Sequence, residues 1–353
     1  MVMKKNVLFV VLIILLFTIS CNNGSDKADS NKNLSSRNQA PYRKNWNNED
    51  YPIYGDVESV TRVYYDVEEP FGEIVKKRAE SYFARFNLNG DLVEEEEYSR
   101  EGKLWIKGII TYDANGNDIE RAAHYADGTP LFRNVIKYDD NGCRKVVISY
   151  KEDGTLNGKI FYEYDANGNK IEEAWYNDKG SLDQKYVYKY DAKGNQIVQA
   201  KYKNDGSLYW KEICAYDANG NQLEQTRYQD DGSLYWKKTF IYDLKGNLLE
   251  QNNYNYDGLL SERYTSGYDV DGNKIDVTGY KYNTDGSLDE KYIRKYDLNG
   301  KETETATYDS DGFLIEKVAF KYDERGNIIE TTCYKGGIMN ISYIQEISII
   351  YRQ

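Results

Sequence analysis

A short pattern, Tyr-Asp-x-x-Gly, returns every 26 residues through most of this 353-residue chain. The glycine four residues after the aromatic position never varies, whereas the spacing changes once, to 28 residues between Tyr268 and Tyr296. The aromatic position is occupied in turn by Phe86, Tyr112, Tyr138, Tyr164, Tyr190, Tyr216, Tyr242, Tyr268, Tyr296 and Tyr322. This regularity constrains the architecture more than any other feature of the sequence, but it does not by itself name a function.

Each repeat contains two turn signals. The first is Tyr-Asp-x-x-Gly-Asn, as in residues 164–169, and the second is Tyr-x-x-Asp-Gly-Ser, as in residues 202–207. An early Asp and a late Gly favour a type I turn that ends in a residue with positive φ. The intervening stretches of about eight to ten residues are rich in Tyr, Ile, Val and Thr, which are typical of β-strands. The sequence therefore predicts a unit of two antiparallel strands and two hairpin turns.

Charged residues predict how the strands pair. If both loops hold four residues, the residue eight positions after the repeat tyrosine faces the residue 21 positions after it. Opposite charges directly across a ladder stabilise it by only about 0.2–1 kcal/mol, so their main effect is to specify register. The predicted pairs are Glu94 with Lys107, Glu120 with Arg133, Glu172 with Lys185, Glu224 with Lys237, Glu250 with Arg263, Asp276 with Lys291 and Glu304 with Lys317. We expect this charged face to lie in solvent.

The opposite face of each hairpin is expected to be apolar and buried. It would carry the repeat tyrosines, the residue seven positions later (Ile119, Ile171, Ile197, Leu223, Leu249, Ile275 and Ile329) and the leucines after the second turn (Leu156, Leu182, Leu208, Leu234, Leu260, Leu288 and Leu314). Open sheets seldom exceed about ten strands without curling, and this one would have roughly twenty. We predict an all-β fold: tandem 26-residue antiparallel hairpin repeats forming one long, curved or spirally wound sheet with the apolar face inward. A flat ribbon is the alternative.

The N-terminus carries a targeting signal. Two lysines precede an uninterrupted apolar run at residues 7–17, about half of the roughly 20 residues that a membrane-spanning helix needs. The next four residues, Thr-Ile-Ser-Cys, end at Cys21 and resemble the bacterial lipobox, in which the cysteine is lipidated and becomes the new N-terminus. This resemblance implies a lipoprotein signal peptide at residues 1–20; an ordinary signal peptide or an uncleaved anchor is the alternative. Residues 21–50 are rich in Asn, Ser, Lys and Asp and are expected to form a flexible tether.

Three copies of Tyr-Asp-Ala-Asn-Gly-Asn, at residues 112–117, 164–169 and 216–221, resemble the YD, or RHS, repeat of bacterial cell-surface proteins. The resemblance implies a β-sheet that winds into a spiral or shell. The closer likeness is to short Gram-negative YD-repeat lipoproteins, which implies a lipid-anchored protein of the cell envelope, at the outer membrane.

The repeat also divides the rest of the chain. We expect a β leader module at residues 51–85, a YD-repeat array at residues 86–337 and a closing strand at residues 338–353.

Few residues suggest catalysis, a metal or a cofactor, and we expect a non-enzymatic protein with none of these. His124 is the single histidine, so a His-based triad or zinc site cannot be assembled. The Asp-rich turns superficially resemble calcium loops, but their glycine is fourth rather than sixth. Turn chemistry is therefore the expected role of these residues, and bound calcium is the alternative. The net charge of -12 argues against nucleic acid as a partner.

Four aromatic residues are candidates for a binding site. Trp210 and Trp236 occupy equivalent positions in successive repeats and are expected inward, two strands apart, as core residues or as a platform for a sugar or peptide. Tyr280 and Tyr282 belong to the two-residue insertion around Tyr280-Lys281-Tyr282, which is expected to lengthen a hairpin loop from four residues to six. The expected function is to present the sheet to a protein or glycan. The alternative is a structural or protective shell component acting with a separately encoded effector, as in larger RHS proteins.

Overall fold

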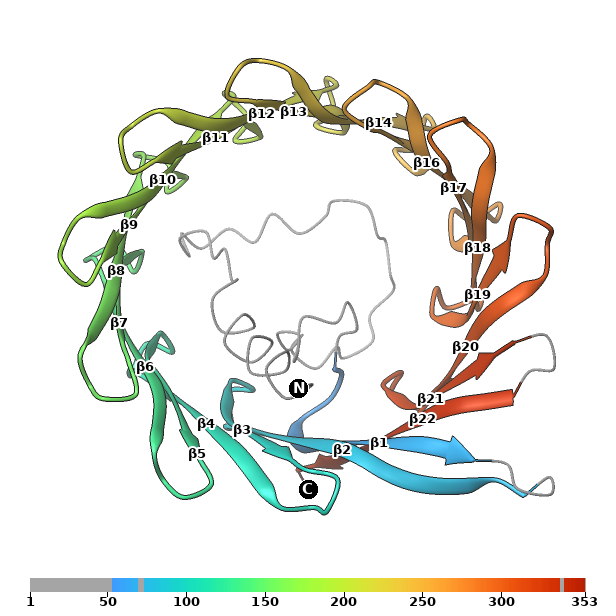
Figure 1. Cartoon of the computed structure of the whole chain (residues 1–353), viewed down its shortest axis with the longest axis horizontal. Helices are drawn as coiled ribbons and strands as arrows, with labels where there is room; N and C mark the ends of the chain where they lie inside the picture. Colours follow the sequence, from blue (N-terminus) through green and yellow to red (C-terminus); the bar gives the residue numbers. More distant parts are fainter. Residues whose placement is uncertain (1–52, 69–72, 337–339, 353) are drawn as a thin grey trace.

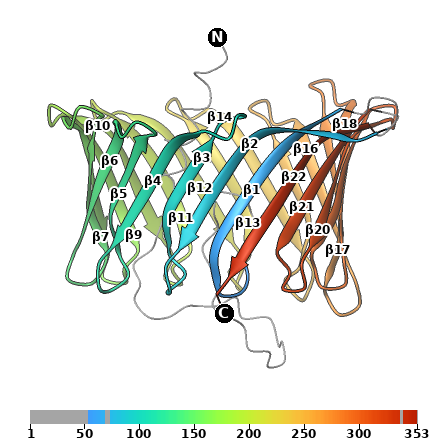
Figure 2. The same cartoon turned by 90° about the horizontal axis from the view of Figure 1, so that it is seen from below.

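The described residues of the protein form one β-sheet of 22 antiparallel strands that closes on itself (Figures 1 and 2). The computed structural model describes residues 53–68, 73–336 and 340–352. Strand β1 (Val57–Glu68) pairs with β2 (Val75–Phe86) on one side and with β22 (Asn340–Tyr351) on the other. The predicted all-β array of tandem hairpins is confirmed, and the pairing of β1 with β22 makes it a closed barrel rather than a spiral.

The strands between β2 and β22 follow the repeat, and every even-numbered strand from β4 to β20 ends at a repeat tyrosine. Turns of the first type therefore gather at one rim of the barrel and turns of the second type at the other (Figure 2). The strands are β3 (Leu92–Tyr98), β4 (Leu104–Tyr112), β5 (Asp118–Tyr125), β6 (Pro130–Tyr138), β7 (Arg144–Tyr150), β8 (Leu156–Tyr164), β9 (Lys170–Asn177), β10 (Leu182–Tyr190), β11 (Gln196–Lys203), β12 (Leu208–Tyr216), β13 (Gln222–Gln229), β14 (Leu234–Tyr242), β15 (Leu248–Tyr254), β16 (Leu260–Tyr268), β17 (Lys274–Tyr282), β18 (Leu288–Tyr296), β19 (Glu302–Asp309), β20 (Leu314–Tyr322) and β21 (Ile328–Lys335).

The turn after β12 shows why the repeat keeps Asp and Gly. The backbone N–H of Gly220 donates to the carbonyl of Asp217 at 3.2 Å, and Gly220 has a φ of 90°, which glycine adopts without steric cost. The carboxylate of Asp217 accepts hydrogen bonds from the backbone N–H groups of Asn219 and Asn221, at 2.8 and 2.9 Å. It also accepts one from the Asn221 side-chain amide at 2.8 Å. The carboxylate therefore closes the turn, as predicted.

The predicted strand register is wrong by two residues. Glu224 faces Thr239, and Lys237 faces Thr226. The turn glycine and a β-bulge at Tyr235 each add one residue to the second strand, which moves the partner of Glu224 from position 237 to position 239. Because the shift is even, each side chain stays on its expected face.

Most of the predicted charge pairs consequently form as diagonal contacts on one face. Lys237 and Glu224 are 2.6 Å apart, and equivalent ion pairs join Lys107 to Glu94, Arg133 to Glu120, Lys185 to Glu172, Arg263 to Glu250 and Lys317 to Glu304. The predicted pair Asp276 with Lys291 is wrong, because Lys291 faces Tyr280 and Asp276 faces Lys295.

The residues seven positions after the repeat tyrosine do not form the predicted buried row. Tyr216 pairs with Gln222 and Ala215 pairs with Glu224, so a bulge leaves Leu223 without a partner in the ladder. Leu223 is 42% exposed, and Leu249, Ile275 and Ile329 are exposed in the same way. Ile119, Ile171 and Ile197 are half-buried, as are the leucines that follow the second turn. A bulge repeated in every unit thus moves these side chains out of the packed row.

The 28-residue unit does not lengthen a loop, as was predicted. Its turn keeps the usual form, with the N–H of Gly286 bonded to the carbonyl of Asn283 at 2.9 Å. The last pair before the turn is Tyr282 with Leu288, which corresponds to Tyr254 with Leu260 one hairpin earlier. The two extra residues therefore lie in β17, which has nine residues where β15 has seven, whereas β16 and β18 both have nine.

The two faces of the barrel differ in burial. Along β12, Glu212 and Cys214 are buried, whereas Ile213 and Ala215 are exposed. Inward and outward side chains alternate along a barrel strand, and those on the concave side converge, so the buried set marks the inner face. The outer face carries the diagonal ion pairs, since Ile213 faces Thr226 and Thr226 faces Lys237.

Buried apolar side chains form two small clusters rather than one core. One lies at the closure of the barrel and comprises Ile53, Val57, Val60, Ala84 and Phe86. The other comprises Ile136, Val147 and Ile160, with Tyr138, Tyr162 and Trp175 packed against it. In the described ranges no helix is long and apolar enough to cross a membrane.

Candidate functional site

The inner face is a wall of mixed aromatic and charged side chains. Barrels of about eight strands can be filled by their own side chains, whereas much larger barrels cannot. With 22 strands, the inward side chains of this barrel are therefore displayed along a wall instead of meeting in the centre. This arrangement makes the inner face the natural place to look for a ligand.

Arg227 on β13 lies between the two predicted tryptophans. Its guanidinium carbon is 4.1 Å from the ring centroid of Trp210 on β12 and 5.1 Å from that of Trp236 on β14. The guanidinium also donates to the carboxylate of Glu212 at 2.9 Å, and the side-chain amide of Gln225 donates to the other oxygen of that carboxylate at 2.5 Å. Both indoles thus lie on the inner face, two strands apart, and a salt-bridged arginine holds them in place.

Further rings and cations continue this arrangement around the wall. Tyr186 on β10 packs edge-on against Trp210, with 6.2 Å between ring centroids. The ammonium of Lys201 on β11 is 5.4 Å from the centroid of Tyr186, and that of Lys238 is 5.3 Å from the centroid of Trp236. We define the aromatic band as Tyr186, Lys201, Trp210, Arg227, Trp236 and Lys238. It crosses five neighbouring strands, a width of about 19 Å.

The charges of the aromatic band are not balanced locally. Arg227 has Glu212 as its partner, but neither Lys201 nor Lys238 makes an ion pair with a carboxylate in the part of the chain that the structure describes. A chain with a net charge of -12 therefore presents a locally cationic surface inside its barrel.

Two exposed tyrosines accompany the band. Tyr209 and Tyr235 precede the two tryptophans in the chain, and they are 51% and 52% exposed. The ammonium of Lys201 is 5.2 Å from the ring centroid of Tyr209, which places this ring beside the band. The sequence analysis identified the two tryptophans as candidates but not these tyrosines. Their equal spacing in the repeat was the available signal.

The band continues toward β8 and β9. Trp175 donates its indole N–H to Glu173 at 2.7 Å, and the ammonium of Lys170 is 4.7 Å from the ring centroid of Tyr188. Gly158 stands where the next repeats have Gln184 and Trp210. A hollow of about 370 Å³ lies beside Trp175, lined in part by Gly158, Phe132, Asn134 and Ser149.

The other two predicted residues lie elsewhere. Tyr280 faces Arg263 and Lys291, both of which belong to the basic row of the outer face. The ammonium of Lys291 is 5.9 Å from its ring centroid. Tyr282 ends β17 next to the second-type turn. The structure therefore brings Trp210 and Trp236 together but does not bring Tyr280 or Tyr282 to them. His124 faces Lys107 and Pro130, and no group of three or more potential metal ligands occurs among the described residues.

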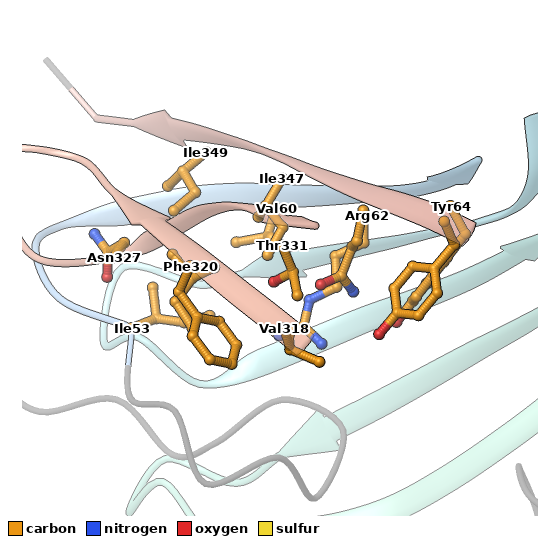
Figure 3. A pocket seen from close by; sticks show the side chains of 13 residues that line it. Ile53, Val60, Arg62, Tyr64, Val318, Phe320, Asn327, Thr331, Ile347 and Ile349 are labelled. Atoms are coloured by element: carbon orange, nitrogen blue, oxygen red, sulfur yellow. The ribbon is translucent and has the colours of Figure 1, made fainter. Parts of the chain in front are cut away.

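A second feature of the inner face is a pocket where the first and last strands meet (Figure 3). We call it the seam pocket, and its volume is about 320 Å³. It lies between β1, β20, β21 and β22, and Figure 3 shows the side chains of Val318, Phe320 and Ile53 among those that line it. Arg62, Asn327 and Thr331 contribute polar groups. The lining is otherwise largely aliphatic and aromatic.

A network of hydrogen bonds holds the start of the described chain beside this pocket. Asn327, which is 2% exposed, accepts a hydrogen bond from the N–H of Tyr54 at 2.6 Å and donates one to its carbonyl at 3.0 Å. Asn327 also donates to the hydroxyl of Tyr351 at 2.6 Å, and that hydroxyl donates to Asp323 at 2.5 Å. Residues from both ends of the sheet are thereby fixed to one turn.

Four consecutive glutamates on β3 divide between the two faces. Glu94 and Glu96 lie on the outer face within 2.9 Å of Lys107. Glu95 and Glu97 lie on the inner face, where burial raises the pKa of each carboxyl to about 7. Nearby Glu80 contributes to the shift of Glu97. These inner carboxyls are separate from the aromatic band.

Comparison with known proteins shows likeness of shape only. No family model matches the chain, and neither does any curated protein. A solved TcdB2–TccC3 structure without its hypervariable C-terminal region matches with 11% identity and a TM-score of 0.25, over 81% of this chain and 21% of that one. The chain therefore spans about a fifth of the length of that protein. A porin-like protein from Bacteroides uniformis matches with 11% identity and a TM-score of 0.31, over 83% of this chain and 98% of that one. At these TM-scores the likeness assigns neither a family nor a function.

Proposed function

We propose that the chain is a non-enzymatic lipoprotein of the cell envelope that binds an extended glycan along the aromatic band. The observation that carries this proposal is the alternation of rings and cations around the inner wall, with Trp210, Arg227 and Trp236 fixed on three consecutive strands. Aromatic rings offer large apolar faces at a small entropic cost, and the polar groups beside them supply directional contacts.

The geometry suits a linear ligand. Equivalent residues in successive repeats lie two strands apart, or about 9–10 Å, so Tyr209 and Tyr235 repeat at roughly the length of a disaccharide unit. The apolar faces of sugar rings stack on aromatic side chains, and their hydroxyls accept hydrogen bonds from lysine and glutamine. Lys201 and Lys238, which make no ion pair within the described residues, favour a glycan that carries acidic groups.

The envelope location rests on the N-terminal sequence, which lies outside the described residues. A lipid on Cys21 would attach the protein to a membrane, probed by replacing Cys21 with Ala and following labelled palmitate. Loss of label and of membrane retention would support the anchor, whereas unchanged label in this variant would overturn it. Cys214→Ala is the matched control, because Cys214 is buried in the barrel wall.

A structural or protective shell acting with a separately encoded effector is the second candidate. The uninterrupted ladder around the ring favours it, since closure leaves no free sheet edge in the described chain. The two candidates differ in what the purified protein captures. A glycan array and a pull-down from envelope extract distinguish them: glycan binding lost in a Trp210→Ala, Trp236→Ala double variant supports the first. Capture of a protein partner that the double variant retains equally well supports the second.

A further inference from the structure

We propose that the seam pocket is the docking site for residues 46–52 of the same chain, with the side chains of Trp46 and Tyr51 on its apolar wall. The pocket lies on the inner face between the first strand and the last three, and it is separate from the aromatic band. The inference does not depend on glycan binding.

The position at which the described chain begins supports this occupant. Ile53 is part of the pocket lining, is 6% exposed, and packs with Val57 and Val60. The following residue, Tyr54, donates its backbone N–H to the side-chain amide of Asn327 and accepts a hydrogen bond from that amide at its carbonyl; Asn327 also lines the pocket. The chain that precedes Ile53 therefore starts at the wall of the pocket itself. The residues just before Ile53 are therefore attached to the pocket, whereas a separate partner would have to reach it from outside the barrel.

The chemistry of the segment matches that of the pocket. Val318, Phe320 and Ile347 give the pocket an apolar wall, which is stabilised by excluding water. Most of residues 21–50 are polar, but Trp46 and Tyr51 are large aromatic residues close to Ile53. Seven residues of extended chain span at most about 23–25 Å, so Trp46 is within reach of the pocket.

Docking would have two consequences. The pocket is bounded by β1 together with β20, β21 and β22, so a segment bound there contacts both ends of the sheet and reinforces the closure of the barrel. It would also fix the point at which the tether leaves the barrel, on its inner side. Cys21 would then be separated from the docked segment by the chain between residues 21 and 46.

Limited chymotrypsin digestion of the full chain, followed by mass spectrometry, tests this docking. Tyr42 and Trp46 are both cleavage sites and lie four residues apart. In the folded protein we expect cleavage after Trp46, relative to cleavage after Tyr42, to be at least about tenfold slower than in urea-unfolded protein. Equal relative rates in the folded and unfolded states would overturn the proposal.

A substitution in the seam pocket distinguishes protection of Trp46 by docking from protection by contacts elsewhere. Val318→Glu places a charge in the pocket and should restore cleavage after Trp46, whereas Ile315→Glu, at an exposed position on the same strand, should leave protection unchanged. Circular dichroism shows whether each variant keeps its sheet. If Val318→Glu does not fold, the milder Phe320→Ala takes its place. Protection that persists in a folded pocket variant would contradict the assigned docking site.

Discussion

Arg227 stacks on Trp210 with 4.1 Å between the guanidinium carbon and the ring centroid, in the middle of a cationic and aromatic wall inside the barrel. The arginine does not fix this geometry alone, because the 4%-exposed carboxylate of Glu212 accepts its hydrogen bonds. The band therefore depends on a buried ion pair that belongs to the wall and not to any ligand.

Removing the carboxylate should show the energetic importance of that pair. Glu212→Ala leaves the guanidinium of Arg227 without its partner, and we expect the free energy of unfolding to fall by about 1–3 kcal/mol in urea denaturation. Glu224→Ala, which removes an exposed partner of Lys237, is the matched control and should change it by less than about 1 kcal/mol. Equal effects of the two substitutions would show that the inner pair does not organise the wall.

The turn glycines should be sensitive to substitution because of their backbone conformation. Gly220 has a φ of 90°, and a Cβ placed there would meet only the Asn195 side chain at 3.7 Å, so space is not the constraint. Gly220→Val should destabilise the protein by more than about 1 kcal/mol, since a β-branched residue resists positive φ. Gly220→Asn should be milder, because Asn tolerates this region. Thermal melting curves compare the two, and equal melting temperatures would contradict the account.

The corrected register is tested by engineered disulfides. Thr226 and Lys237 are direct partners across β13 and β14, whereas Glu224 and Lys237 are diagonal. Directly opposed Cβ atoms lie about 4.5–5.5 Å apart, close to the range of a disulfide, and diagonal ones are about 7–8 Å apart. Cysteines at positions 226 and 237 should therefore oxidise faster than cysteines at 224 and 237. Thiol titration follows the oxidation of each pair. Faster oxidation of the diagonal pair would contradict the observed register and support the register expected from charge alone.

The glutamates of β3 should affect stability in opposite directions with pH. Burial, together with Glu95 and Glu80, raises the pKa of Glu97 to about 7, above its ordinary 4.5. The stabilising contribution of this carboxyl is complete below about pH 4.5 and is lost as the pH rises through about 7. Glu97→Gln should consequently raise the melting temperature above pH 7 and leave it nearly unchanged at pH 4.5.

Glu94 provides the comparison of opposite sign. Burial acts to raise its pKa, but hydrogen bonds from Arg85 and Lys107 lower the pKa to about 2. Its contribution is present above about pH 4.5 and is lost as the pH falls toward 2, so Glu94→Gln should destabilise the protein at pH 7 and not near pH 2. Parallel pH profiles for the two variants would show that the two faces of β3 do not differ in environment.

Comparison of sequence and structure shows which features the repeat determines. Tyrosine, aspartate and glycine at fixed spacing predicted the strands, the turns and the inward position of Trp210 and Trp236. The sequence did not predict the register, because the turn glycine and a bulge at Tyr235 each add one residue, and no residue type marks the bulge. The sequence did not predict ring closure, because closure depends on the curvature summed over all hairpins and on the pairing of β1 with β22.

The candidate site was only half predictable for a related reason. The two tryptophans share one repeat position, so the sequence placed them together. Arg227, Glu212 and Lys238 belong to other positions whose residues vary between repeats, and only the register brings them to the indoles. Conversely, Tyr280 was singled out because the repeat changes near it, but the extra residues lengthen β17 and leave Tyr280 among outer-face cations.

Binding of an acidic oligosaccharide, measured by isothermal titration calorimetry on wild-type protein and on a Trp210→Ala, Trp236→Ala double variant, tests the central claim most directly. Tyr280→Ala, on the outer face, is the control for removal of an aromatic ring. We predict that the double variant binds at least about tenfold more weakly, a loss of about 1.4 kcal/mol or more, while the control stays within about twofold of wild type. Equal affinity in a folded double variant, or a loss in the control instead, would contradict glycan binding along the inner wall.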